Sequence, residues 1–163
     1  MKRYFLPVIL CLLFLVLPLN IFAISGNLGV GIQGALYKIQ WSDFGSFVTS
    51  TVSDLQDIGP VYSGKTAWAF VCWFLGGLFL GLIMLISLLT IDSPKRVTYG
   101  TYSGFLFLSG VLFIVSSMLR FGVLFTGAVG FTLPFGAFLI LLFAIAILVY
   151  PDFFVTELAN ESG

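Results

Sequence analysis

The chain has 163 residues, of which 60% are apolar and only 9% are charged, with seven basic residues balanced by seven acidic ones and no histidine. A soluble domain of this length cannot bury so much apolar surface, because a short chain leaves a large share of its surface exposed on folding. The composition therefore favours a membrane protein, and the lack of net positive charge excludes an ordinary nucleic-acid-binding surface.

Four long apolar runs predict four transmembrane helices. Each has roughly the 17 to 25 residues that cross a hydrocarbon core of about 30 Å, and none contains an internal Asp, Glu, Lys or Arg. Peptide groups in lipid must be hydrogen-bonded within the segment, which favours helices. The predicted fold class is therefore an all-α membrane protein, an antiparallel four-helix transmembrane bundle with a small extracytoplasmic cap. It forms a single domain over 1–163, with spans at about 4–24, 67–91, 102–119 and 133–150.

The first apolar run allows two interpretations. Lys2 and Arg3 precede it, and the stretch Ala23-Ile24-Ser25 resembles a signal-peptidase site. The run has about 21 residues, longer than the usual apolar part of a signal peptide and long enough to span a bilayer. We expect a retained first transmembrane helix, with a cleaved signal peptide over residues 1–25 as the alternative.

The predicted outer loop, residues 25–66, has room for a structure outside the membrane. Apolar and polar residues alternate over Leu28–Ile32 and Tyr37–Trp41, which predicts two short strands of a small antiparallel sheet. An apolar stripe over Phe44–Leu55 predicts a short helix, although Val48–Val52 suits a strand equally well. Either Ser42 or Asp43 is expected to cap this helix.

The same loop supplies the candidate interaction residues. In the expected strand Tyr37–Trp41, Lys38 points to the face opposite Trp41 and is expected to meet water or a partner. Trp41 and Phe44 form either an exposed binding patch or the loop's own small core, and we expect the core. The candidate residues for interaction outside the membrane are Tyr37, Lys38, Trp41, Asp43 and Phe44.

Small residues at helical spacing predict where the helices pack. Lipid gives no hydrophobic drive for helix association, so close packing at Gly, Ala and Ser marks the contact lines. The third run has such residues every seven positions, a spacing that suits left-handed crossings. The candidate helix-packing residues are Gly77, Gly81, Ser103, Gly110 and Ser117.

Basic residues near the ends of the runs predict the orientation. One side of the membrane receives Lys2, Arg3, Lys95 and Arg96, and the other receives Lys38, Lys65 and Arg120. We therefore expect a multi-pass integral membrane protein with both termini in the cytoplasm, the long loop outside and the polar tail 151–163 inside.

No residue pattern indicates catalysis. There is no histidine to act as a base, and the apolar runs hold no carboxylate to relay protons. Cys11 and Cys72 lie inside apolar runs and are expected to be apolar fillers. Asp54 and Asp57 alone supply too few oxygen ligands for a cation. We expect no enzyme activity, no catalytic, cofactor-binding or metal-binding residues, no cofactor, and neither a small-molecule substrate nor a nucleic acid as partner.

The layout resembles the claudin and peripheral myelin protein group of tetraspan proteins. The stretch Gly34–Ile39 lies where that family has a Gly-Leu-Trp motif followed by Cys, and Arg96–Gly110 is similar to its third span in Gly and Phe content. Tyr37 stands in place of the Trp, and the loop has no cysteine for the family's disulfide. The resemblance implies four spans, a structured first outer loop and both termini inside.

These observations predict a non-catalytic membrane protein that acts by lateral or adhesive association through its outer loop and helix contact lines. Its expected partners are membrane lipid and other membrane proteins or a second copy of itself. An alternative is an accessory subunit of a larger membrane enzyme or transporter complex, because such subunits also lack active residues. A channel or transporter is a third hypothesis, weakened by the scarcity of polar residues in the runs.

Overall fold

The computed structural model describes residues 5–26, 29–59, 63–89 and 99–150. The basic residues used for orientation, Lys2, Arg3, Lys95 and Arg96, and the tail 151–163 lie outside the described residues.

Helices and strands are both present along the described chain. The helices are α1 (Phe5–Val16), α2 (Thr51–Gln56), α3 (Gly64–Leu89), α4 (Tyr99–Phe121) and α5 (Phe135–Val149). The strands are β1 (Asn20–Ile24), β2 (Gly29–Gln33), β3 (Tyr37–Ser42), β4 (Gly45–Ser50), β5 (Thr126–Gly127) and β6 (Gly130–Leu133).

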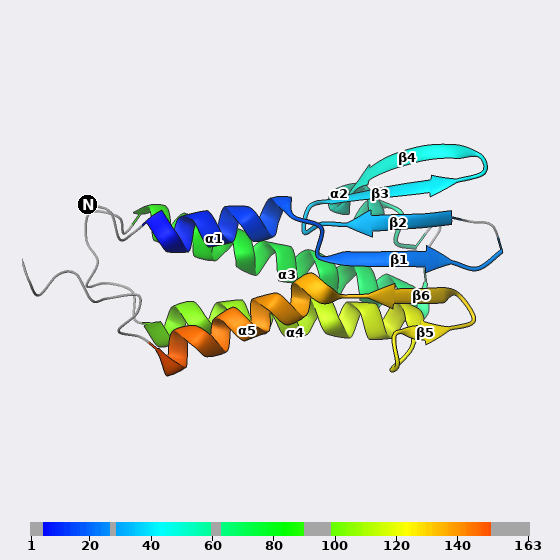
Figure 1. Ribbon diagram of the computed structural model, residues 1–163. Helices are drawn as coiled ribbons and strands as arrows, with labels where there is room; N and C mark the ends of the chain where they lie inside the picture. Colours follow the sequence, from blue (N-terminus) through cyan, green and yellow to red (C-terminus); the bar gives the residue numbers. More distant parts are fainter. Residues whose placement is uncertain (1–4, 27–28, 60–62, 90–98, 151–163) are drawn as a thin grey trace, which may run out of the picture.

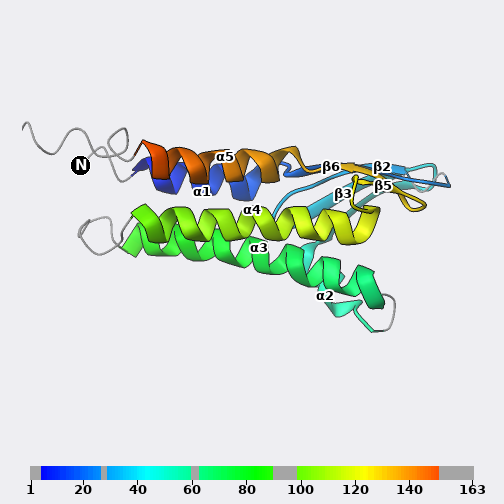
Figure 2. The same cartoon turned by 90° about the horizontal axis from the view of Figure 1, so that it is seen from below.

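These elements form two layers. Helices α1 and α5 and the sheet make one layer, with the sheet continuing the line of the two helices (Figures 1 and 2). The longer helices α3 and α4 make the second layer and run behind both α1 and α5 and the sheet, with α2 beside α3 (Figure 2). The hydrophobic core lies between the layers, where Phe14, Trp73, Phe113 and Ile140 are buried.

All strand pairs in the sheet are antiparallel, in the order β4-β3-β2-β1-β6-β5. The first four strands follow one another along the chain, whereas β6 comes from the segment just before α5. Strand β1 lies between β2 and β6. A signal peptide cleaved near residue 25 would remove this strand from the middle of the sheet, and the described fold therefore uses residues that such cleavage would take away.

The all-α prediction is wrong, because a six-stranded antiparallel sheet accompanies the helices. The run 4–24 was expected to be one helix, but α1 ends at Val16 and β1 begins at Asn20. Pro18 explains the change, since proline disfavours the helical conformation in the residue before it and lacks an N–H. Beyond Pro18 the chain is extended, and Phe22 lies across from Gly31, whose missing side chain leaves room for the phenyl ring.

The helix expected over Phe44–Leu55 is a strand followed by a helix. Residues Gly45–Ser50 form β4, and α2 begins only at Thr51. Ser50 caps α2: its Oγ accepts from the Ser53 N–H at 3.0 Å, and the Ser53 Oγ accepts from the Ser50 N–H at 3.1 Å. Ser42 and Asp43, the expected caps, lie instead at the turn between β3 and β4.

Within the described residues, two helices are long and apolar enough to cross a membrane, over Gly64–Leu89 and Gly100–Phe121. Helix α5 is apolar but has only 15 residues, and α1 has 12. A bundle of four membrane-spanning helices is therefore not what the chain forms, and the tetraspan layout has no support here.

Helix α4 packs against its neighbours through small residues on two sides. Ser109 and Ser116 donate across to α3, to the Gly76 carbonyl at 2.7 Å and the Ala69 carbonyl at 2.6 Å. On the side of α5, Ser103 donates to the Ala144 carbonyl at 2.6 Å. These hydrogen bonds give α4 fixed contacts that do not depend on a hydrophobic effect.

The five candidate packing residues have different surroundings. A Cβ on Gly110 would meet the side chain of Leu141 in α5 at 2.8 Å, whereas a Cβ on Gly77 would meet the Ala35 carbonyl of the loop between β2 and β3 at 3.1 Å. Space around Gly81 is open. Ser103 bonds to α5, as described, and Ser117 bonds within its own helix, to the Phe113 carbonyl.

Replacing Gly110 by Leu should destabilise the fold by about 1–3 kcal/mol, because the new side chain must displace Leu141 and crowd the Ala137 carbonyl. The matched control is Gly104→Leu, where space is open, and it should change stability by less than about 0.5 kcal/mol. Thermal unfolding in detergent, followed by circular dichroism, measures both. Equal midpoints for the two variants would remove Gly110 from the contact between α4 and α5.

Candidate functional site

The two faces of the sheet differ in chemistry. The face toward α3 and α4, the inner face, carries polar side chains that are buried. The face away from these helices, the outer face, carries apolar side chains, many of them exposed. This is the reverse of a soluble antiparallel sheet, whose apolar face packs on the core and whose polar face meets water.

A row of polar residues crosses the inner face. Asn20, Gln33, Lys38 and Thr49 are direct neighbours on β1, β2, β3 and β4, and the first three are buried. Thr132 of β6 extends the row, since its hydroxyl donates to the Asn20 side-chain oxygen. The row therefore places amide, hydroxyl and ammonium groups where water is largely excluded.

Lys38 forms the charged part of this row. Its Nζ lies 3.9 Å from Oδ1 of Asp54, which α2 brings beneath the sheet, and the two residues are only 7% and 3% exposed. Burial lowers the pKa of Lys38, and the positive charge of Arg120 lowers it further, while Asp54 opposes both effects. Burial likewise raises the pKa of Asp54. Each of the two groups thus favours the charged form of the other.

Arg120 closes the cluster from the end of α4. Its guanidinium carbon lies 5.2 to 5.5 Å from the ring centres of Phe22, Phe70 and Phe121, in the range of cation–π contact. Beside it lies a small cavity, lined by Asn20 and Gln33 among others. It has room for about one water molecule, which is too little for an organic ligand.

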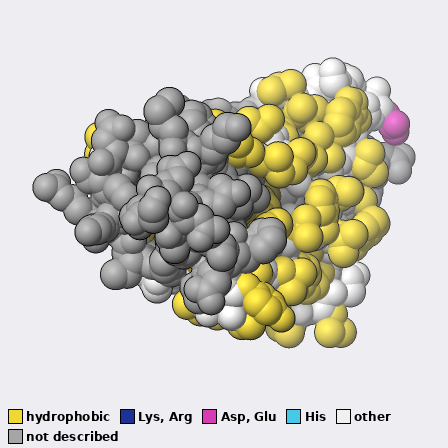
Figure 3. All heavy atoms as spheres, turned by 60° about the vertical axis from the view of Figure 1, so that its left-hand side comes forward, with side chains coloured by type: hydrophobic (Ala, Val, Ile, Leu, Met, Phe, Trp, Pro, Cys, Tyr) yellow, Lys and Arg dark blue, Asp and Glu magenta, His cyan; other side chains and the backbone are white. Residues whose placement is uncertain are grey.

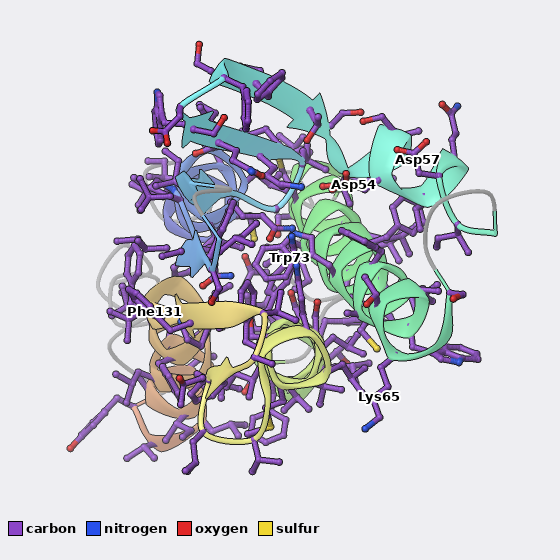
Figure 4. All side chains as sticks on the ribbon, turned by 90° about the vertical axis from the view of Figure 1, so that its right-hand side faces the viewer. Asp54, Asp57, Lys65, Trp73 and Phe131 are labelled. Carbon is purple, nitrogen blue, oxygen red and sulfur yellow. The ribbon has the colours of Figure 1, made fainter. Side chains whose placement is uncertain are left out.

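Hydrogen bonds from three described side chains help to attach the sheet to the helices. The Trp73 indole of α3 donates to the Gly34 carbonyl at 3.0 Å, and the Thr51 hydroxyl of α2 donates to the Ala35 carbonyl at 3.0 Å. The Tyr37 hydroxyl donates to the Val16 carbonyl at the end of α1, at 2.7 Å. Figure 4 shows Trp73 and Asp54 between the sheet and the helices. The sheet is therefore held at its helix-proximal end from three directions.

The outer face is a continuous apolar surface. Val48, Ile39, Ile32, Ile21 and Leu133 are neighbours on five successive strands. A second row further from the helices consists of Trp41, Val30, Ala23 and Phe131, and Phe131 points away from the helices in Figure 4. Neither row holds a charged side chain.

The hairpin of β3 and β4 is the most exposed part of the sheet. We call its four large apolar residues, Trp41, Phe44, Phe47 and Val48, the hairpin surface. Phe44 at the turn is 82% exposed, Val48 is 73% exposed and Trp41 is 45% exposed. Phe47 extends from the opposite side of β4, so apolar groups are exposed on both sides of this strand. Strand β4 is also an edge of the sheet, with no charged residue along Gly45–Ser50.

The predicted interaction residues fall into two groups. Trp41, Asp43 and Phe44 are exposed on the hairpin, and the expectation that Trp41 and Phe44 form a small core is wrong. Tyr37 is half-buried and bonded to α1, and Lys38 is buried against Asp54, so the expectation that Lys38 faces water is wrong. The reason is that the polar face of β3 packs on the helices.

Sequence reasoning missed Phe47 and Val48, because the expected helix hid their place on an edge strand. The absence of any charged residue between Gly45 and Ser50 could have marked that strand as exposed and unprotected. The ion pair of Asp54 with Lys38 has no signal in the sequence, since nothing along the chain connects Asp54 with a residue sixteen positions before it.

No family model, curated protein or solved structure matches this chain. The resemblance to the claudin and peripheral myelin protein group therefore stays a prediction, and function must be argued from the surfaces and the helices alone.

Replacing Lys38 by Met should lower the free energy of unfolding by about 3 kcal/mol or more, because it leaves the Asp54 carboxylate buried without its cation. Adding Asp54→Leu should recover much of this loss, since the double variant Lys38→Met/Asp54→Leu holds no unpaired charge. Lys38→Glu should be worse than Lys38→Met, because it sets two carboxylates against each other. Thermal unfolding in detergent compares the variants, and a double variant that is less stable than Lys38→Met would contradict the pairing.

Proposed function

We propose that this chain is a non-catalytic, multi-pass integral membrane protein that associates with another protein chain through the hairpin surface. Helices α3 and α4 cross the bilayer, the connection between them and both termini face the cytoplasm, and the sheet lies on the outer side. The length and apolar character of Gly64–Leu89 and Gly100–Phe121 support the membrane assignment. Basic residues at Lys95 and Arg96 support the orientation.

One observation carries the association: the hairpin surface exposes four large apolar side chains on an edge strand without charge. Contiguous exposed apolar surface on a folded protein marks an interaction site. The free edge of β4 adds unpaired N–H and C=O groups, which another chain can use for hydrogen bonds. Association through the helix-packing residues is less suitable, since Gly110 and Ser103 already make the contact between α4 and α5.

Cysteine labelling tests the orientation. In a chain with Cys11 and Cys72 replaced by Ala, a cysteine at Ser46 on the exposed strand β4 should react with an impermeant thiol reagent added to intact cells. A cysteine at Ser93, in the connection between α3 and α4, should react only after the membrane is permeabilised. Labelling of Ser93 alone in intact cells would show the opposite orientation.

The association is tested with Phe44→Ser and Val48→Ser. Each should weaken association by about tenfold or more, because burying a Phe or Val side chain is worth about 1.5 to 3 kcal/mol. Energy transfer between two labelled populations of the chain measures lateral association when both are in one vesicle. Vesicle clustering measures adhesion when they are in separate vesicles.

The matched control is Val123→Ser. Val123 is as exposed as Val48 but follows α4, near the opposite edge of the sheet, and its replacement should leave association unchanged. If both hairpin variants associate like the unaltered chain, the hairpin surface is not the interface. If the chain instead purifies from native membranes with a fixed set of other subunits, and the hairpin variants release them, the partner is another protein and the accessory-subunit alternative holds.

A further inference from the structure

We propose that the membrane–water boundary crosses the sheet, so that the helix-proximal part of the outer face contacts lipid acyl chains while the far end of the hairpin, with Trp41 and Phe44, stands in water. The contacting part, here called the lipid patch, is Ile21 of β1, Ile32 of β2 and Leu133 of β6. This inference rests on the proposed membrane location of α3 and α4 and assigns an occupant to a surface that the proposed association does not use.

Helix lengths give the first argument. Helix α5 has 15 residues between Pro134 and Tyr150, and at 1.5 Å per residue it extends about 22 Å. A hydrocarbon core is about 30 Å thick. Helix α3, with 26 residues, covers about 39 Å on the same scale. Because α5 lies in one layer with the sheet and α3 runs behind both (Figures 1 and 2), the missing distance beside α5 is occupied by strand residues.

The strand that precedes α5 makes up this difference. Residues in a strand advance about 3.3 Å each, so the last residues of β6 reach the level at which the hydrocarbon core ends. Leu133 lies at this point, and Ile21 and Ile32 are its neighbours across β1 and β2. The lipid patch therefore lies at the depth that α5 alone leaves uncovered.

Surface continuity gives the second argument. The exposed side of α5 is apolar, with Leu139 and Leu142 exposed on it, and this surface passes into Leu133 and Ile21 without a charged side chain between them. Figure 3 shows hydrophobic side chains over much of the described part of this side of the molecule, and no Lys or Arg is visible there. A lipid-facing helix surface and the lipid patch thus form one apolar area.

Backbone hydrogen bonding gives the third argument, because peptide groups in contact with lipid must be paired. The lipid patch lies on inner strands: β1 is paired with both β2 and β6, and β2 is also paired with β3. At the junction with the helices, the Leu19 N–H donates to the Gln33 carbonyl and the Gly136 N–H donates to the Leu19 carbonyl. The edge strand β4 is separated from the lipid patch by β3.

Trp68 marks the same level from the other layer. It lies on α3 and is 64% exposed, and tryptophan is enriched where membranes meet water. It is five residues nearer the start of α3 than Trp73, which bonds to Gly34 at the helix-proximal end of the sheet. Five residues of a helix correspond to about 7.5 Å along its axis. Trp68 therefore lies beyond the helix-proximal end of the sheet, at the depth of the strands themselves.

Spin labelling tests the boundary. Nitroxides are attached at cysteines introduced singly as Ile21→Cys and Leu133→Cys, in the chain with Cys11 and Cys72 replaced by Ala and reconstituted into phosphatidylcholine vesicles. Collision rates are measured with oxygen, which concentrates in lipid, and with a nickel chelate, which stays in water. The lipid reference is Leu142→Cys on α5, and the water reference is Phe44→Cys on the hairpin.

Both patch labels should resemble the Leu142 label, with oxygen collisions exceeding nickel collisions, and the Phe44 label should show the reverse. If both patch labels resemble the Phe44 label, the whole sheet stands in water and the inference is overturned. If they are protected from both reagents and show dipolar broadening, a second copy covers the patch, which also overturns it. If the Leu142 label is itself accessible to nickel, α5 does not face lipid, and the failure lies in the proposed membrane location.

Discussion

A buried charge needs a partner of opposite sign, and Lys38 on the inner face of the sheet has one, Asp54 of α2, only because the sheet lies on the helices. Trp73 of α3 holds the turn after β2 in the same orientation. Turning the sheet over would expose the polar row of its inner face to lipid or water and bury the apolar rows instead. The polar row therefore fixes which face of the sheet is presented outward, and with it every surface available for binding.

This orientation separates two environments on one face. Next to α1 and α5 the apolar outer face continues a helix surface, and further out it ends in the hairpin, where the apolar groups of Phe44 and Phe47 have no helix behind them. An apolar exterior over a polar interior thus suits both the proposed contact with lipid and the proposed association through the hairpin.

Several features were predictable from the sequence. Alternation identified β2 and β3, and seven-residue spacing of small residues located contacts that α4 makes through Ser103 and Gly110. Hydropathy identified α3 and α4 but failed for the run 4–24, because hydropathy is blind to the break that Pro18 makes between helix and strand. The pairing of Lys38 with Asp54 was not predictable, since it depends on α2 folding back beneath β3. The prediction that Lys38 meets water is wrong, because alternation along a strand does not show which of its two faces is buried.

The place of β1 between β2 and β6 has a consequence for how the chain is made. Asn20 and Thr132, which are bonded to each other, are 112 positions apart, so β1 leaves the ribosome long before its neighbour β6 exists. The first hairpins can form early, but one side of β1 stays unpaired until α4 is complete and residues Gly130–Leu133 follow it. Unpaired strand edges in partly made chains invite wrong pairing. Assembly of the sheet is therefore among the last events of synthesis, and in a chain that stops before residue 130 the strand β1 is left as an open edge.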